Sequence, residues 1–565
     1  MMAFASGLAL TLAMAGIGQH LLTREAQRTP TAWAHAIGMG LLAWGGIGLV
    51  LGALQRLTAD HLLWMAGLSL CGWIVPRVRI RPMAVGVGLG IMLLLPAAIS
   101  VSSGRLNTDE LYLHLGLPLQ MLLEEGLLGG PLHPNGSRPL TLSMAYATAL
   151  GTDIPQTAAA MHWWLCVGTI ALTVQAAREH LERTSIGILA AVVLAASTTF
   201  ASASAHAGSD IPTAFAVLLA MDAARRGHIR GAGLAAGLAL SLKYTAWSPL
   251  VGVWLLMHTG HMQRVRSAGL ALAVVSPWWV RNLLSGEHAL FPFTGWTAPD
   301  LQFQFLEKYG AGRDLIDFAL LPYRMVVNAD PTSFEFLGRI HPYLIVLLVP
   351  CVIAVRSSRL RPWAVTTAVG LIGWAMGPHW LRYLIPSLPI IALTGAAATL
   401  PLCRGTWSRG VLTVGLVVGA YSGLQGHELT GADPDRLVDR SGDSAIEFCN
   451  EALPDDARLA LLFSWRSSDI GVRQILGSVE DHNPTRHFLI SNKGRIIDAL
   501  REAGATHALV RRVTFLPSHY DGLTSAQYTE EFREPVSALD DALLMGADLL
   551  FRSPSHRVYR IPQTN

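Results

Sequence analysis

Isolated carboxylates occur at the ends of long apolar segments, where charge is costly unless it is solvated or used. Asp109 and Glu110 follow the apolar segment 83–101, and Asp210, with His206 nearby, precedes another apolar run. Adjacent carboxylates in such a place could take a proton from a hydroxyl group. Asp109 and Asp210 could equally be N-caps of the helices that follow them, and His206 could be an ordinary loop histidine.

Cationic and aromatic residues occur at other segment ends. Lys243 is the only lysine among the first 307 residues, and Tyr244 follows it directly. Arg281 comes after a Trp pair, whereas His379 and Arg382 stand together where a later apolar segment begins. Lysine and arginine beside a carboxylate would suit a lipid phosphate. The alternatives are a snorkelling lysine and interfacial anchors, although an arginine at a helix start opposes the helix dipole and favours an anionic partner.

The overall composition indicates a membrane protein. The chain has 565 residues, of which 51% are hydrophobic and 14% are charged, and its mean hydropathy is +0.40. Soluble proteins carry roughly 25% charged residues, so a soluble enzyme, a disordered chain and a coiled coil are excluded. A net charge of +3 gives no argument for a nucleic-acid partner. The five cysteines form no CxxC pair, so we expect neither a zinc site nor a disulfide framework.

Apolar segments that could cross a membrane recur along the first 424 residues. A span needs roughly 17–25 apolar residues, or fewer where protein covers it. The sequence predicts about 14 such helices. They lie near 3–22, 33–54, 61–75, 83–101, 158–177, 185–200, 211–224, 231–246, 248–260, 267–281, 341–356, 363–377, 383–400 and 410–424.

The arginines of the short loops predict the orientation. Every second connection is rich in arginine, which predicts that these connections face the cytoplasm. Segment 139–150 is too short to span and would reverse this alternation, so we expect a helix lying against the membrane. Residues 102–157 and 282–340 then form two large outer loops, and 110–127 reads as an amphipathic interfacial helix.

The end of the chain has a different composition. About 45 charged residues fall in 1–424 and about 36 in the much shorter 425–565, which is typical of a soluble domain. Alternating strand-like and helix-like runs predict a small α/β domain with a parallel or mixed sheet on the outer side. The predicted strands are 457–463, 487–490, 507–510 and 556–561, and the predicted helices are 444–453 and 494–504.

These polar positions, taken in order, resemble the GT-C superfamily of membrane glycosyltransferases. The nearest similarity is to the family 39-like group, which includes protein O-mannosyltransferases and lipid A aminoarabinose transferases. No single motif is specific, but the ordered set spans about 83–400. The matching pieces are Asp109-Glu110 with its helix, His133-Pro134 to Leu150, Asp210-Ile211-Pro212, Lys243-Tyr244-Thr245, Pro277-Trp278-Trp279 with Arg281-Asn282, and Arg382-Tyr383 with Pro386.

The resemblance implies an inverting transferase that uses a polyprenyl-phosphate sugar at the outer face of the cytoplasmic membrane. It implies that Asp109, or alternatively Glu110, is the general base, while Lys243, Arg281 and Arg382 stabilise the leaving phosphate. It further implies that Asp210, His206, Tyr244 and His379 contact the substrates. The acceptor would be a lipid, a glycan or a protein. Some superfamily members use a divalent ion, but no metal-ligand spacing is evident here, so no cofactor is expected.

The domain organisation follows from the same comparison. Residues 83–424 would be the catalytic membrane module, 425–565 the outer α/β domain, and 1–82 an extension of three additional helices packed on its side. A ligase for lipid-linked polymers with the same fold is one alternative. A transporter or a non-catalytic scaffold is another, although the sequence shows neither mid-span ionisable residues nor broken helices in paired halves.

Overall fold

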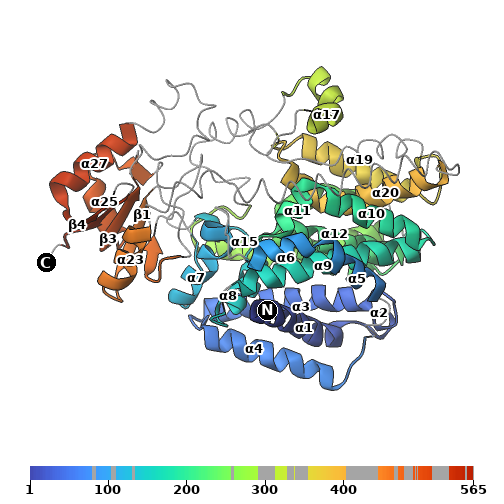
Figure 1. Ribbon diagram of the computed structural model, residues 1–565, viewed down its shortest axis with the longest axis horizontal. Helices are drawn as coiled ribbons and strands as arrows, with labels where there is room; N and C mark the ends of the chain where they lie inside the picture. The colour runs from blue at the N-terminus through green and yellow to red at the C-terminus, as the bar shows by residue number, and fades with distance from the viewer. Residues whose placement is uncertain are drawn as a thin grey trace.

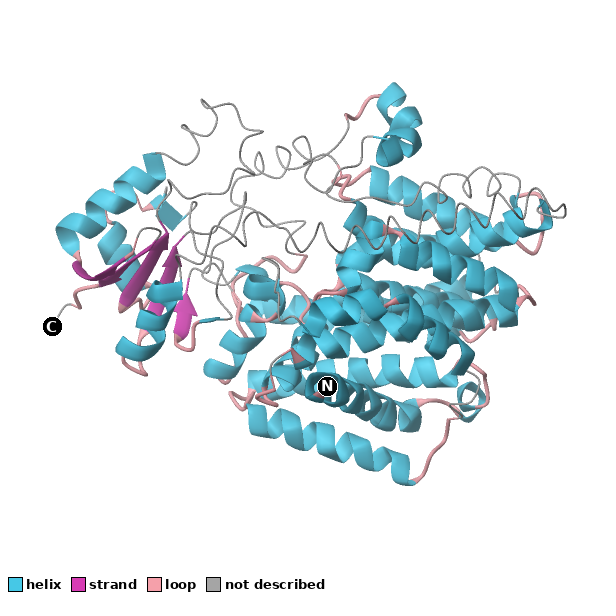
Figure 2. Ribbon diagram, viewed as in Figure 1, coloured by secondary structure: helices cyan, strands magenta, loops and turns pink. Residues whose placement is uncertain are grey.

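The computed structural model contains a helical body and a small sheet domain beside it (Figures 1 and 2). We call the end of the body that faces this sheet domain the domain end, and the opposite end the far end. The structure describes residues 1–78, 84–102, 110–129, 134–154, 156–255, 257, 260–290, 312–327, 336, 354–402, 443–462, 469–475, 488–489, 491–492, 494–511, 534–553 and 556–563.

The described part of the body is almost entirely helical. Its α-helices are α1 (Met2–Leu21), α2 (Arg24–Gln27), α3 (Ala32–Ala53), α4 (Ala59–Cys71), α5 (Ala84–Leu93), α6 (Leu95–Ser102), α7 (Gly116–Leu123), α8 (Thr141–Leu150), α9 (Thr157–His180), α10 (Thr184–Ala196), α11 (Thr198–Ser204), α12 (Asp210–Arg225), α13 (Ile229–Leu242), α14 (Trp247–Leu255), α15 (His261–Leu284), α17 (Leu315–Val327), α19 (Arg361–Ala375) and α20 (Leu388–Thr399). The short helical turns are η1 (Gly72–Ile74), η3 (Glu110–His114), η4 (Pro134–Ser137), η5 (Tyr244–Ala246), η6 (Leu381–Ser387) and η7 (Leu400–Leu402).

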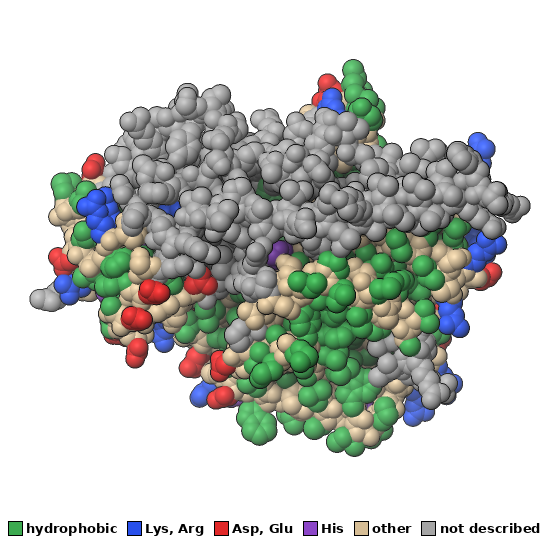
Figure 3. Space-filling model, viewed as in Figure 1, with side chains coloured by type: hydrophobic (Ala, Val, Ile, Leu, Met, Phe, Trp, Pro, Cys, Tyr) green, Lys and Arg blue, Asp and Glu red, His purple; other side chains and the backbone are tan. Residues whose placement is uncertain are grey.

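Several of these helices are long and apolar enough to cross a membrane. Within the described residues there are four, namely α1, α3, α9 and the continuous helix Leu381–Thr399, or up to six if each of two bent pairs is one span. Hydrophobic side chains cover the middle of the body, and Lys and Arg gather at its far end (Figure 3). The chain is therefore a multi-pass membrane protein. The predicted count of about 14 spans is not confirmed, because several predicted spans form shorter helices, while 410–424 and most of 341–356 lie outside the described residues.

The two bent pairs correct one expectation from the sequence, which showed no broken helix. The helices α5 and α6 meet at 59°, and α10 and α11 meet at 79°. A change of direction at Ser197 or Leu94 leaves the apolar pattern continuous, so hydropathy alone reads each pair as one straight span. The second halves, α6 and α11, contact each other and lead toward the segments that carry Glu110 and His206.

The basic loops meet at the far end, as their alternation predicted. His228 lies 3.1 Å from Glu25, and Arg359 lies 3.2 Å from Glu182. Each pair joins two arginine-rich connections that are far apart in the sequence. The grouping is consistent with one common side for these loops.

The N-terminal helices pack closely on the rest of the body. Helix α1 contacts α3 and α9, and the backbones of α1 and α3 approach so closely that a Cβ on Gly18 would collide with the Ala36 carbonyl. Helix α8 is buried among α3, α7 and α9, and Tyr146 on it is fully buried. Segment 139–150 is thus helical as predicted, but protein covers it, so the expected position against the membrane is wrong.

The C-terminal domain is a five-stranded mixed sheet with flanking helices. Its elements are α23 (Asp443–Ala452), β1 (Arg458–Leu462), β2 (Arg473–Ile475), α25 (Ile496–Glu502), β3 (His507–Arg511), α27 (Glu534–Gly546), β4 (Asp548–Arg552) and β5 (His556–Arg560). The strand order is β2-β1-β3-β5-β4; β1 runs parallel to β2 and β3, whereas β5 runs antiparallel to β3 and β4. Leu459 lies opposite both Gln474 and His507.

The predicted strand 487–490 is wrong. Phe488 and Leu489 are helical, and Leu489 is buried in the domain core against Ile475 and Leu500. A run of three apolar residues after a histidine fits a buried helical turn as well as a strand, so periodicity could not decide between them. The strands β2 and β4 and the helix α27 were not predicted, whereas β1, β3, β5, α23 and α25 were.

Candidate functional site

Glu110 is a fully buried carboxylate at the domain end of the body. Its Oε2 lies 2.9 Å from Nδ1 of His206, and its Oε1 accepts a hydrogen bond of 2.5 Å from the Ala207 backbone N–H. Both carboxylate oxygens therefore have a polar partner, as a buried polar group requires. The pair joins two residues that are 96 positions apart in the sequence.

A π-helical turn, η3, presents Glu110 to this loop. The Leu115 N–H donates to the Glu110 carbonyl at 2.8 Å, which closes the wide turn just before α7. Such single turns are rare and occur often at functional sites, because they re-aim side chains within a helix. The expected interfacial helix 110–127 is therefore two pieces, and α7 is covered by protein: Leu117 and Met121 are buried.

Tyr146 and His162 support the other side of the same loop, and the sequence reading missed both. The Tyr146 hydroxyl lies 3.0 Å from Nδ1 of His162 and donates to the Gly208 carbonyl at 2.8 Å. Nε2 of His162 lies 3.0 Å from the Ala203 carbonyl. Lone polar residues in apolar helices were the available signal, because buried polar groups need partners.

Asp210 and Lys243 form an ion pair three residues beyond this loop. Lys243 Nζ donates to Asp210 Oδ1 at 2.6 Å, and their side chains are 22% and 14% exposed. Lys243 Nζ also lies 4.6 Å from the centre of the Tyr383 ring. The guanidinium carbon of Arg382 lies 5.4 Å from that same ring centre and 4.6 Å from the Trp380 ring. Two of the predicted cations therefore share one aromatic ring beside a carboxylate.

Arg281, predicted to bind the donor phosphate, contacts carbonyls of the outer loop, and its role toward a phosphate stays a prediction. Its guanidinium is buried and donates to the carbonyls of Leu128 and Arg138 at 2.8 and 2.9 Å, and also to the Gly136 carbonyl. Asn282 next to it donates to the Ser137 carbonyl at 2.6 Å. These contacts fasten the outer loop to the end of α15, and they occupy both terminal nitrogens of the guanidinium group.

The remaining predicted residues lie as follows. The Tyr244 hydroxyl accepts from Trp279 Nε1 at 3.0 Å, so its ring faces α15. His379 is fully buried, with Nε2 3.0 Å from the Ala375 carbonyl and its ring 5.6 Å from the Trp374 ring. Asp109 lies outside the described residues. Its role as the base stays a prediction.

The next question is whether residues of the site could hold a metal ion. Among the residues that the structure describes, no group of three or more His, Cys, Asp and Glu side chains is arranged to hold a metal ion. Glu110 and His206 supply two potential ligands, but the Ala207 N–H occupies one carboxylate oxygen. The expectation of a metal-independent reaction therefore remains a prediction.

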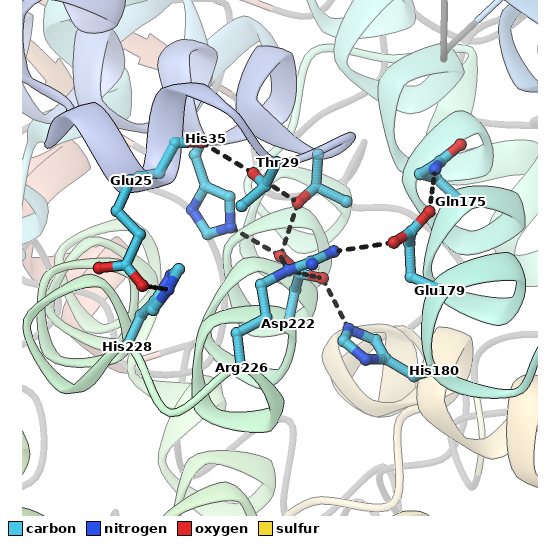
Figure 4. A network of polar contacts seen from close by, with 11 residues as sticks. Glu25, Thr29, His35, Gln175, Glu179, His180, Asp222, Arg226 and His228 are labelled. Atoms are coloured by element: carbon cyan, nitrogen blue, oxygen red, sulfur yellow. Dashed lines mark hydrogen bonds and ion pairs between the residues drawn. The ribbon is translucent and has the colours of Figure 1, made fainter.

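A second polar cluster, at the far end, was not anticipated from the sequence (Figure 4). Asp222 is fully buried, and four side chains contact its carboxylate oxygens. The distances are 2.9 Å to His35 Nε2, 2.7 Å to His180 Nε2, 2.7 Å to the Thr31 hydroxyl and 3.1 Å to Arg226 Nε. These partners come from α3 and the residue before it, from α9, and from the residue that follows α12. The cluster joins the N-terminal helices to the body and saturates the carboxylate, so it is a structural joint.

Comparison with known proteins identifies the fold. No protein-family model matches this chain, and neither does any curated protein sequence. The chain is similar to the crystal structure of ArnT from Cupriavidus metallidurans bound to undecaprenyl phosphate, with a TM-score of 0.50 and 13% identity over 87% of this chain and 98% of that one.

Weaker similarity extends to two other solved structures. Arabinofuranosyltransferase AftD from Mycobacteria gives a TM-score of 0.46 and 14% identity over 86% of this chain and 40% of that one. The oligosaccharyltransferase AglB from Archaeoglobus fulgidus gives a TM-score of 0.44 and 11% identity over 84% of this chain and 74% of that one. At 13% identity, the likeness to the ArnT structure shows that the two chains share a fold.

Proposed function

We propose that this chain is an inverting glycosyltransferase that moves a sugar from a polyprenyl-phosphate donor to a lipid, glycan or protein acceptor at the outer face of the cytoplasmic membrane. The observation that carries the proposal is the pairing of Asp210 with Lys243 beside the Arg382–Tyr383 cation–ring contact, where two cations converge at the end of a membrane body. The solved ArnT structure of the same fold is bound to undecaprenyl phosphate, which supports a lipid phosphate as ligand.

In the proposed reaction Asp109 takes the proton from the acceptor hydroxyl. The acceptor oxygen then forms a bond to the anomeric carbon on the face opposite the phosphate, and the carbon–oxygen bond to the phosphate breaks with inversion. The bonding electrons leave with the phosphate oxygen, where Lys243 and Arg382 stabilise the growing negative charge. Asp210 would orient a sugar once Lys243 turns to the phosphate.

The contacts of Glu110 favour Asp109 over Glu110 as the base. Because both oxygens of Glu110 already accept hydrogen bonds from His206 and Ala207, a bound hydroxyl would have to displace one of them. Glu110 then holds the segment that carries Asp109 against the 206–208 loop. Arg281, by its carbonyl contacts, would shape the outer loop above the donor.

The arrangement of the chain in the membrane is part of the proposal. Residues 83–424 would be the catalytic module and 425–565 an outer domain, periplasmic or extracellular, while 1–82 would be a lateral extension held by the Asp222 cluster. The joined basic loops at the far end support a cytoplasmic position for that end.

Substitution of Asp109 by Asn tests the proposal. Loss of a general base lowers the rate by about 10²–10⁴-fold, so transfer from a polyprenyl-phosphate sugar should fall by that factor while binding of the polyprenyl phosphate persists. Asp153→Asn is the matched control, because Asp153 is an exposed carboxylate of the same outer loop. Unchanged transfer in Asp109→Asn would contradict the assignment of the base.

The two broken spans favour a transporter as the second candidate, because discontinuous helices line substrate paths in such proteins. The same variant separates the two functions. A transporter reconstituted in vesicles would move solute without forming a glycosidic bond, and Asp109→Asn would change its ion coupling. A new glycosidic bond formed by the wild-type protein, and lost in the variant, would exclude that alternative.

A further inference from the structure

Helix α7 lies between the helical body and the C-terminal domain. On one side it packs against α8, and its Leu117 and Met121 belong to the core of the body. On the other side it contacts β2. Because β2 is the first strand in the order β2-β1-β3-β5-β4, it is an edge strand, and no other strand of the described residues pairs with its outward side.

Gln120 occupies the position that a neighbouring strand would take. Its side chain is buried; its Oε1 accepts the backbone N–H of Gln474 at 2.7 Å, and its Nε2 donates to the Val472 carbonyl at 3.5 Å. In a strand, the carbonyl of one residue and the N–H two residues later face the same side. A carboxamide carries the same donor and acceptor as a peptide group, so Gln120 pairs with the edge of β2 as one more strand residue would.

The same helix leads directly to the candidate site. Glu110 begins the π-helical turn, and its carbonyl accepts the N–H of Leu115 just before α7 starts. Gln120 lies on the second turn of α7, and Leu115 alone separates this helix from the π-helical turn that begins at Glu110, so a shift of α7 would act directly on that turn. A second contact between the domain and the end of α7 is the ion pair of Arg458 with Glu124, 3.2 Å apart. Because these side chains are 40% and 19% exposed, the pair stabilises the interface less than the buried Gln120 contacts do.

We propose that Gln120 is a positioning residue through which the C-terminal domain holds the turn carrying Glu110 in place at the site. The inference rests on the proposed function for its effect on catalysis, but the mechanical coupling that it asserts does not. The domain would thereby act on the reaction through α7 without contacting the substrates.

Hydrogen exchange in the intact protein measures the coupling without any substrate. Gln120→Leu keeps the size of the side chain and removes both amide functions. We expect amide exchange at Gln474 and at Leu115 to become about ten-fold faster, because a lost buried hydrogen bond costs about that factor or more. Gln563→Leu is the matched control: it removes two side-chain bonds to carbonyls of the same domain, away from α7, and should leave Leu115 unchanged.

The catalytic arm uses the same variants with a polyprenyl-phosphate sugar. Gln120→Leu should lower kcat about ten-fold with little change in the KM of the donor, because the turn that begins at Glu110, next in sequence to the proposed base, loses its support while Lys243 and Arg382 do not. Gln120→Glu keeps the acceptor for the Gln474 N–H and should lie between the wild type and Gln120→Leu in both assays. It also supplies the measurement if the leucine variant does not fold.

The outcomes separate the two proposals. Faster exchange at Gln474 with unchanged exchange at Leu115 would overturn the positioning role, as would a normal kcat in a variant whose Leu115 exchange is raised. A wild-type protein that transfers no sugar would contradict the proposed function instead, and the exchange of Leu115 would still decide whether Gln120 holds the turn.

Discussion

Breaking the Asp210–Lys243 pair should change phosphate affinity in opposite directions, depending on which partner is removed. In the structure Lys243 donates to Asp210, so a lipid phosphate must compete with that carboxylate for the ammonium group. Asp210→Asn keeps the shape of the side chain and removes the competing charge. Lys243→Met keeps the length of the chain and removes the cation. We therefore expect Asp210→Asn to tighten the binding of a polyprenyl phosphate, and Lys243→Met to weaken it.

The size of the effect follows from the burial of the pair. Exposed ion pairs contribute about 0.2–1 kcal/mol, whereas loss of one partner from a buried pair costs about 3–5 kcal/mol. With an Nζ–Oδ1 distance of 2.6 Å and exposures of 22% and 14%, this pair lies between the two, near about 2 kcal/mol. That free energy corresponds to about 30-fold in a dissociation constant. Asp210→Asn should approach this gain, and Lys243→Met should lose a similar factor.

The assay is direct binding of a polyprenyl phosphate to the purified protein in detergent or nanodiscs, by calorimetry or by displacement of a labelled lipid. The double variant should bind like Lys243→Met, because without the cation there is nothing for Asp210 to compete for. Arg458→Met is the matched control, since it removes a cation from the partly exposed pair at the C-terminal domain. Its affinity should equal that of the wild type.

Weaker phosphate binding in Asp210→Asn would refute this reasoning. It would mean that the carboxylate presents the lysine to the phosphate, so that the pair acts as one unit. Additive changes in the double variant would also contradict the competition, because they would show that Asp210 acts on the lipid independently of Lys243.

Two further predictions concern residues outside the proposed phosphate contacts. Arg281→Met should lower the free energy of unfolding by about 3 kcal/mol, because the buried carbonyls of Leu128 and Arg138 lose a charged donor. Thermal unfolding measures this loss. An unchanged affinity for the polyprenyl phosphate would show that Arg281 supports the loop, and a weakened affinity would show that it binds the phosphate. Burial, aided by Arg560, lowers the pKa of His507, so the unfolded state binds more protons, and the protection of β3 amides from exchange should fall as the pH drops through about 6.5. His507→Gln should remove that slope, and an unaltered slope would point to another group.

Much of the site could be read from residue type and position. Charge is scarce in this chain, so Glu110, Asp210, Lys243 and Arg382 stood out at segment ends. The structure places Lys243 and Arg382 at one aromatic ring and pairs Lys243 with Asp210. The basic loops likewise predicted their grouping at one end, because loop charge is a local property that orientation in the membrane depends on.

Other features depended on contacts between distant segments. No spacing in the sequence pairs Glu110 with His206, or brings His35, His180 and Asp222 together, because each contact joins separate helices whose packing is fixed by the whole body. The bends at α5/α6 and α10/α11 were equally invisible, since hydropathy records how apolar a segment is but not its direction.

The sequence by itself determined that this chain lies in a membrane. It also determined which few charged residues stand at the ends of the apolar segments. Only the tertiary structure decided what those charges do. Arg281 and Lys243 look alike in the sequence, because both are cations at span ends. In the structure Arg281 donates hydrogen bonds to loop carbonyls, whereas Lys243 pairs with a carboxylate and lies over an aromatic ring. The difference arises because a side chain's role depends on the partners that long-range packing brings within hydrogen-bond distance, and sequence periodicity carries no record of those partners.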